Sequence, residues 1–175
     1  MVGRSARGRW LQYCGAGAST APADTGGNRP NQCADDAKKV TWLGGGAAKF
    51  YAVAAQKQGV RSLAYSQGAL QFDMVVQQAP AGKVQLAVEC GAPCLGQVDL
   101  SAVLKTTPLE LKRTIKIPLL CLEEVGADFL NIDVPFSMST DQPFAATFAN
   151  IQLVAGAAKD ADALRCADVG VDLKL

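Results

Sequence analysis

The 175-residue chain contains no histidine, and this absence limits the chemistry that its side chains could perform. Histidine is the base in the common serine and cysteine nucleophile sites and a frequent metal ligand. It is also the side chain whose charge normally changes near neutral pH. Acid–base catalysis by this chain would therefore depend on carboxylates, lysine, tyrosine or cysteine.

Carboxylates are the main remaining candidates for acid–base chemistry. Hydrolysis of a glycosidic bond needs two carboxyl groups held at a fixed separation across the sugar. The candidate acids in the strand-rich part of the chain are Asp73, Glu89, Asp99, Glu110, Glu123, Glu124, Asp128 and Asp133. Most of them flank turns or occupy outward strand positions, where a solvated charge needs no further role. Glu123 and Glu124 are sequence neighbours, so their side chains would point in different directions. We therefore predict no catalytic residue in this chain.

The six cysteines include one closely spaced pair, in Cys90-Gly-Ala-Pro-Cys94. A zinc site would need a second close pair to complete a tetrahedron, and none is present, so we predict no metal site. The spacing instead favours a structural disulfide between Cys90 and Cys94 that closes a loop at a strand end. Six cysteines allow fifteen connectivities, and Cys14 and Cys33 could clip the Gly- and Ala-rich segment between them. Disulfides fit an oxidising compartment, so we expect a secreted or periplasmic protein.

Alternation of apolar and polar residues predicts the elements that must position these side chains. In Ala69-Leu-Gln-Phe-Asp-Met-Val-Val76 the even positions are apolar, and Lys83-Val-Gln-Leu-Ala-Val-Glu-Cys90 repeats the pattern. Such alternation indicates strands with one face on a core and one toward water. Pro80 and Gly82 predict a turn that pairs the two strands as a hairpin. Eight or so short strands without long helices indicate an all-β antiparallel jelly-roll sandwich.

The predicted boundaries are a linker or loop segment at residues 1–38, a β-sandwich domain at 39–155 and a C-terminal tail at 156–175. The first segment is rich in Ala, Gly, Thr and Pro and lacks core-forming periodicity. The chain carries 17 basic and 16 acidic residues, which argues against a broad basic surface for nucleic acid. No apolar run approaches the length of a membrane span. We therefore expect neither nucleic acid nor a membrane as a partner.

One face of the predicted sheet carries polar side chains that could recognise sugar hydroxyls. The candidates are Gln71, Asp73, Gln85, Glu89 and Lys116, on outward positions of strands that could be neighbours. Carbohydrate sites usually add an aromatic platform, but aromatics make up only 6% of this chain, and Trp42 and Tyr65 are the best outward candidates. The alternative is an ordinary hydrated sheet face without a ligand.

Several segments in order resemble one known family over residues 40–154. They are Gly68-Ala-Leu-Gln-Phe-Asp-Met74, Glu89-Cys-Gly-Ala-Pro-Cys94, Val98-Asp-Leu-Ser101, Ile115-Lys-Ile-Pro-Leu-Leu-Cys-Leu122, Gly126-Ala-Asp-Phe129, Val134-Pro-Phe136 and Phe148-Ala-Asn-Ile-Gln-Leu153. They resemble the C-terminal ExoP-type galactose-binding-like domain of bacterial family 3 glycoside hydrolases, which are exo-acting β-glucosidases and glucan glucohydrolases.

The resemblance implies a jelly-roll domain that follows the catalytic domains of a larger enzyme and contains no catalytic residue itself. Its expected roles are to pack on the catalytic domains, to shape substrate access, or to bind glucan weakly. The alternative is an independent carbohydrate-binding module that recognises β-glucan oligosaccharides through the polar sheet face. A jelly roll can also hold a structural calcium ion, but the chain lacks an ordered series of acidic ligands, so we expect no cofactor.

Overall fold

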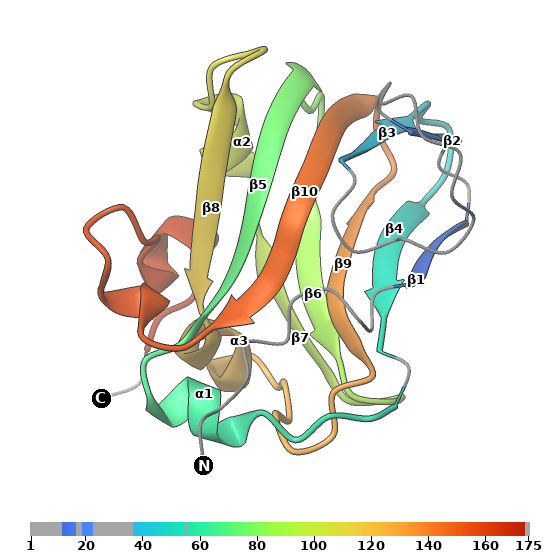
Figure 1. The fold of residues 1–175 in the computed structure, drawn as a ribbon. Coiled ribbons are helices and arrows are strands. Elements are labelled where there is room, and N and C mark those ends of the chain that lie inside the picture. The colour runs from blue at the N-terminus through green and yellow to red at the C-terminus, as the bar shows by residue number, and fades with distance from the viewer. Residues whose placement is uncertain (1–11, 17–18, 23–36, 55, 174–175) are drawn as a thin grey trace.

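The protein is a β-sandwich of two five-stranded antiparallel sheets (Figure 1). The computed structural model describes residues 12–16, 19–22, 37–54 and 56–173, with side chains from residue 37 onward. Sheet A has the strand order β1-β4-β9-β6-β7, and sheet B has the order β2-β3-β10-β5-β8. The predicted all-β jelly-roll class is confirmed. No helix among the described residues is long and apolar enough to span a membrane.

The elements have the following bounds. The strands are β1 Gln12–Ala16, β2 Ser19–Pro22, β3 Lys38–Trp42, β4 Ala48–Val53, β5 Ala69–Gln78, β6 Gln85–Glu89, β7 Leu95–Asp99, β8 Lys112–Pro118, β9 Val134–Thr140 and β10 Phe144–Val154. The α-helices are α1 Arg61–Tyr65, α2 Ser101–Lys105 and α3 Leu119–Glu124, and the 3-10 helices are η1 Ala157–Lys159 and η2 Cys166–Val169.

The core lies between the sheets, and the alternating sequence pattern correctly predicts which residues enter it. Leu70, Phe72, Met74 and Val76 of β5 are at most 1% exposed. The apolar residues of the second predicted strand, Val84, Leu86 and Val88, are fully buried. Six large aromatic rings fill the centre and come from both sheets: Trp42, Phe50, Phe72, Phe136, Phe144 and Phe148.

The predicted hairpin between β5 and β6 is wrong. In the structure β5 pairs with β10 and β8 in sheet B, whereas β6 pairs with β7 and β9 in sheet A. The connection at residues 79–84 therefore crosses from one sheet to the other. The apolar faces of the two strands pack face to face across the core, instead of lying side by side in one sheet. Alternation indicates which face of a strand is buried, but it does not indicate which strand lies beside it in the sheet.

The structure differs from the sequence prediction at both ends of the chain. Within residues 1–38, β1 pairs with β4 at the edge of sheet A, and β2 pairs with β3 at the edge of sheet B. An edge strand is held by backbone hydrogen bonds to one neighbour, so it needs no strong apolar alternation. The suggested pairing of Cys14 with Cys33 lies outside the described residues.

The segment after β10 packs against the sandwich and does not extend away from it as a tail. A disulfide joins Cys121 of α3 to Cys166 of η2, and Val169 and Val171 are 1% and 5% exposed. The backbone N–H of Leu164 donates to the carbonyl oxygen of Lys116 at 2.9 Å, on the edge strand β8. Residue 169 ends η2, and residues 170–173 form no strand.

Candidate functional site

The five predicted carbohydrate-binding residues do not form one strip. Gln71 and Asp73 lie on β5 and Lys116 on β8, so these three belong to sheet B. Gln85 and Glu89 lie on β6 in sheet A. The outer faces of the two sheets point in opposite directions, so no ligand on one face can reach both groups. The prediction of a single strip assumed that β5 and β6 pair as a hairpin. Because these strands lie in different sheets, the strip does not form.

Asp73 is engaged in a hydrogen-bonded cluster on the outer face of sheet B. Its carboxylate accepts hydrogen bonds from Thr114 Oγ1 at 2.6 Å and Asn150 Nδ2 at 2.8 Å, and it pairs with Lys112 Nζ at 2.8 Å. A register shift in β10 places Asn150 at φ 53°, a left-handed conformation that asparagine tolerates better than most residues. The carboxylate of Asp73 is thus committed to neighbouring side chains.

We expect Asp73 to make the free energy of unfolding depend on pH. Burial would raise the pKa of its carboxyl, but the hydrogen bonds from Lys112, Thr114 and Asn150 together outweigh burial and lower that pKa. The charged form therefore stabilises the fold above the unfolded pKa of about 3.9, and this contribution is lost as pH falls through the lower folded-state pKa. Urea unfolding between about pH 5 and pH 2 should show a shallower decline for Asp73→Asn than for the wild type. Equal slopes would contradict this assignment.

Lys116 holds the C-terminal segment and does not face solvent freely. Its ammonium contacts Asp160 Oδ2 at 2.8 Å and Asp162 Oδ1 at 2.6 Å, and its side chain is only 13% exposed. The hydrogen bonds to Asp160 and Asp162 raise the pKa of Lys116, so it remains charged. Gln71 lies directly across from Lys116 in the β5–β8 pairing. Of the three predicted residues on sheet B, two are therefore committed to structural contacts.

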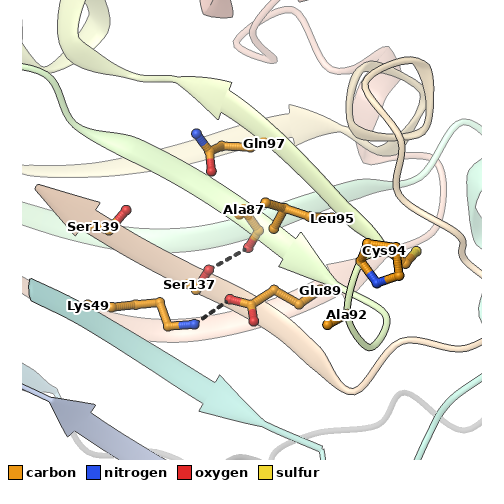
Figure 2. A pocket seen from close by; sticks show the side chains of 10 residues that line it. Lys49, Ala87, Glu89, Ala92, Cys94, Leu95, Gln97, Ser137 and Ser139 are labelled. Atoms are coloured by element: carbon orange, nitrogen blue, oxygen red, sulfur yellow. Dashed lines mark hydrogen bonds and ion pairs between the residues drawn. The ribbon is translucent and has the colours of Figure 1, made fainter. Parts of the chain in front are cut away.

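Sheet A carries a pocket of about 350 Å³ on its outer face (Figure 2). Tyr51, Ser137, Ala87 and Gln97 lie opposite one another in a row across β4, β9, β6 and β7. The two central positions of this row carry small side chains, whereas the flanking strands carry longer ones. The pocket is therefore a depression over β9 and β6. Its lining residues are Lys49, Ala87, Glu89, Ala92, Pro93, Cys94, Leu95, Gln97, Ser137 and Ser139.

An ion pair crosses the pocket from one strand to another. Figure 2 shows Lys49 of β4 reaching over β9 to Glu89 of β6, with Nζ 2.8 Å from Oε1. Oε2 of Glu89 accepts no hydrogen bond from a described residue. Ser137 Oγ donates to the carbonyl oxygen of Ala87 at 3.3 Å and is 2% exposed, so it forms part of the floor. The pocket thus offers both hydrogen-bond donors and acceptors.

The loop closed by Cys90 and Cys94 forms one wall of this pocket. The predicted disulfide is confirmed, and the backbone N–H of Cys94 donates to the carbonyl oxygen of Gly91 at 2.7 Å. Gly91 has a φ of 88°, which favours glycine in this turn. The loop presents Ala92 and Pro93 to the pocket, and Leu95, 40% exposed, continues this apolar wall.

Sequence reasoning found Glu89 but missed most of the pocket. Lys49 lies forty residues from Glu89 in the chain, and only the pairing of β4, β9 and β6 brings the two together. Along β9, Ser137 and Ser139 alternate with the core residues Phe136 and Met138. Small polar residues at outward positions of a central strand are the sequence signal that could have indicated the pocket. Trp42, suggested as an outward aromatic, is 1% exposed in the core, and Tyr65 lies on α1, away from the pocket. The half-buried ring of Tyr51 instead lies beside the pocket, 5.0 Å from Lys49 Nζ.

The arrangement suits binding better than bond cleavage. Among the described residues that line the pocket, Glu89 is the one carboxylate, whereas glycoside hydrolysis by the common route needs two. No group of three or more potential metal ligands occurs among the residues that the structure describes. A single carboxylate beside an ammonium, an amide and hydroxyls can orient a polar ligand by hydrogen bonds.

Comparisons with known proteins agree with this architecture. The exo-1,3/1,4-β-glucanase ExoP of a Pseudoalteromonas species matches with a TM-score of 0.62 and 16% identity, over 84% of this chain and 16% of that chain. Its extra C-terminal domain, solved separately, matches with a TM-score of 0.59 and 18% identity, over 89% of this chain and 91% of the domain. A family 30 carbohydrate-binding module of a Clostridium thermocellum cellulosomal cellulase matches with a TM-score of 0.61 and 14% identity, over 84% of this chain and 91% of the module.

The two smaller neighbours have nearly the same extent as this chain, whereas the chain spans only a small part of the complete glucanase. A comparison with curated proteins finds no match. The model of the Exop_C family, described as galactose-binding domain-like, matches residues 28–153. Because this match covers more than half of the sequence, the chain belongs to the Exop_C family of galactose-binding domain-like domains.

Proposed function

We propose that the chain is a non-catalytic accessory domain of a glycoside hydrolase and that it binds carbohydrate in the pocket on the outer face of sheet A. The observation that carries this proposal is the composition of the pocket. Lys49, Glu89 and Gln97 supply donors and acceptors, while Pro93 and Leu95 supply an apolar wall. A pyranose ring has the matching properties, because it combines polar hydroxyls with apolar C–H faces.

The parent enzyme that we propose is a family 3 glycoside hydrolase, a β-glucosidase or glucan glucohydrolase, with β-glucan as the ligand of this domain. The family assignment and the resemblance of residues 40–154 support this choice. Its partners would then be the catalytic domains of the same enzyme. The disulfides Cys90–Cys94 and Cys121–Cys166 support a secreted or periplasmic location, because such bonds persist in oxidising compartments.

A matched pair of glutamine substitutions tests which face binds the ligand. Gln97 lies in the pocket on sheet A, and Gln71 lies on the outer face of sheet B, with intermediate exposure in both cases. We expect Gln97→Ala to weaken binding of gluco-oligosaccharides by about tenfold, the effect of losing a hydrogen bond of about 1 to 1.5 kcal/mol. Gln71→Ala should leave the affinity unchanged. Isothermal titration calorimetry with mixed-linkage and β-1,4-linked oligosaccharides provides the measurement.

The reverse result, with binding lost in Gln71→Ala and retained in Gln97→Ala, would move the ligand to sheet B and overturn the assignment of the pocket. Circular dichroism of each variant provides the folding control. Gln71 lies on the inner strand β5 and Gln97 on the edge strand β7, and neither side chain enters the core. A loss of affinity in a folded variant therefore reports on the ligand and not on the fold.

A second role, packing on the catalytic domains, is favoured by apolar side chains at one end of the sandwich. The helices α1 and α3 contact each other there (Figure 1). Tyr65 and Leu120 on these helices are 69% and 51% exposed. Leu130 is 51% exposed and lies next to α1, because the carbonyl oxygen of the preceding Phe129 accepts a hydrogen bond from the N–H of Val60. The titration separates the two roles, because a folded wild-type domain without affinity for glucan would leave packing as its function.

A further inference from the structure

The charged side chains on the outer face of sheet A are balanced in sign. Besides the pair of Lys49 and Glu89, Lys83 Nζ lies 4.0 Å from Asp99 Oδ2 on the same face. Behind the disulfide loop, Lys57 Nζ and Asp133 Oδ2 lie 3.2 and 3.7 Å from the position that a Cβ would take on Gly91. Lys49 and Lys83 thus each lie within 4.0 Å of a carboxylate, and Lys57 and Asp133 lie near the same glycine. Among the described residues around the pocket, positive charges therefore do not outnumber negative ones.

Glu89 decides what the polar side of the pocket can accept. Its Oε1 is used by Lys49, and its Oε2 remains an acceptor without a donor among the described residues. A sugar hydroxyl can donate a proton to this oxygen and accept from Lys49 or Gln97 with its own lone pairs. The carboxylate of a uronic acid or a sulfate ester has no proton to donate, so it would place a second negative charge against Glu89.

An acidic sugar group placed against Glu89 would either break the ion pair with Lys49 or set two like charges against each other. If Lys49 turned toward the ligand, Glu89 would be left partly buried, with 24% of its side chain exposed and no partner. A carboxylate that loses its partner in such a position is destabilised by its desolvation. If Lys49 stayed in place, two like charges would face each other within one pocket, where screening by water is reduced.

From this arrangement we infer that the pocket selects neutral sugar units and rejects acidic ones, with Glu89 as the residue that determines the selection. This inference rests on the proposed function, since it concerns the ligand of the same pocket. The neutral hydroxyl is recognised as a donor to Glu89 Oε2, which an anionic substituent cannot be.

The test compares cellotetraose with the same oligosaccharide oxidised at C6 to glucuronate units, by calorimetric titration of the complete 175-residue chain. We expect the neutral ligand to bind at least about tenfold more tightly, which corresponds to about 1.4 kcal/mol. Glu89→Gln keeps the size of the side chain, removes its negative charge and adds an amide donor. In this variant the ratio of the two affinities should fall toward one, through weaker binding of the neutral ligand and tighter binding of the acidic one.

Glu124→Gln provides the matched control, because it removes one negative charge from an exposed position on α3, outside the pocket. It should leave the ratio of affinities as it is in the wild type. Equal affinity of the wild type for both oligosaccharides, or an unchanged ratio in Glu89→Gln, would overturn the inference while leaving carbohydrate binding intact. Failure of the wild type to bind either oligosaccharide would overturn the proposed function and the inference together.

Discussion

Replacement of Phe148 by alanine is expected to lower the free energy of unfolding by about 3 to 5 kcal/mol, the usual cost of removing a buried aromatic ring. Phe148 is fully buried, and its ring centroid lies 5.4 Å from that of Phe50 and 5.8 Å from that of Phe136. These two partners belong to sheet A, whereas Phe148 belongs to sheet B. Phe72 and Trp42 of its own sheet lie 6.3 Å away. Phe148 thus joins the aromatic layers of both sheets.

Urea denaturation followed by tryptophan fluorescence measures this loss, because Trp42 lies in the same cluster. Phe148→Leu is the control, since leucine fills much of the same volume and should cost clearly less than alanine. A domain of this size has a total stability of about 5 to 15 kcal/mol, so the alanine variant could be partly unfolded at room temperature. A loss below about 1 kcal/mol for alanine would show that Phe148 does not hold the two sheets together.

Removal of the disulfide between Cys121 and Cys166 is expected to have the second large effect. The two cysteines are 45 residues apart, and the entropy of closing a loop of this length corresponds to about 4 kcal/mol. In the folded chain this bond ties η2 to α3 and keeps Val169 and Val171 in the core. The double variant Cys121→Ser and Cys166→Ser should therefore unfold at a markedly lower urea concentration than the wild type.

The shorter disulfide provides the comparison. Cys90 and Cys94 are four residues apart, so the same relation gives only about 2 kcal/mol for their bond. Thermal and urea unfolding of the two double variants should show the larger loss for the Cys121–Cys166 pair. The C-terminal segment of the Cys121–Cys166 variant should also become more sensitive to proteolysis, because only noncovalent contacts, such as the ion pairs of Lys116 with Asp160 and Asp162, would then hold it. The opposite order of stabilities would contradict a long-loop effect.

The amino-acid pattern was sufficient to predict the class of the fold and the core-facing residues of its two clearest strands, β5 and β6. Alternation along β5 and β6 correctly predicts the core-facing side chains, because a residue period of two in a strand places every second side chain on one face. The local loop Cys90-Gly-Ala-Pro-Cys94 was predictable for a similar reason, since its two cysteines are close along the chain in any conformation. The resemblance of ordered segments over residues 40–154 indicated the family, which the family match confirms.

The pairing of distant segments was decided only by the tertiary structure. The alternation of residues 69–90 does not reveal that β5 and β6 enter different sheets. Two strands show the same apolar alternation whether they lie side by side in one sheet or face each other across the core. For the same reason Cys121 and Cys166 could not be paired from sequence, with fifteen connectivities available.

The candidate site shows the same division between local pattern and distant pairing. Glu89 was found as an outward acid, but Asp73 and Lys116 turned out to be held by Lys112 and Asp160 on the opposite face. The pocket exists because the strand order of sheet A brings Lys49 and Ser137 to Glu89. Strand order depends on the sum of contacts across the whole core, and that sum is not contained in any single stretch of sequence.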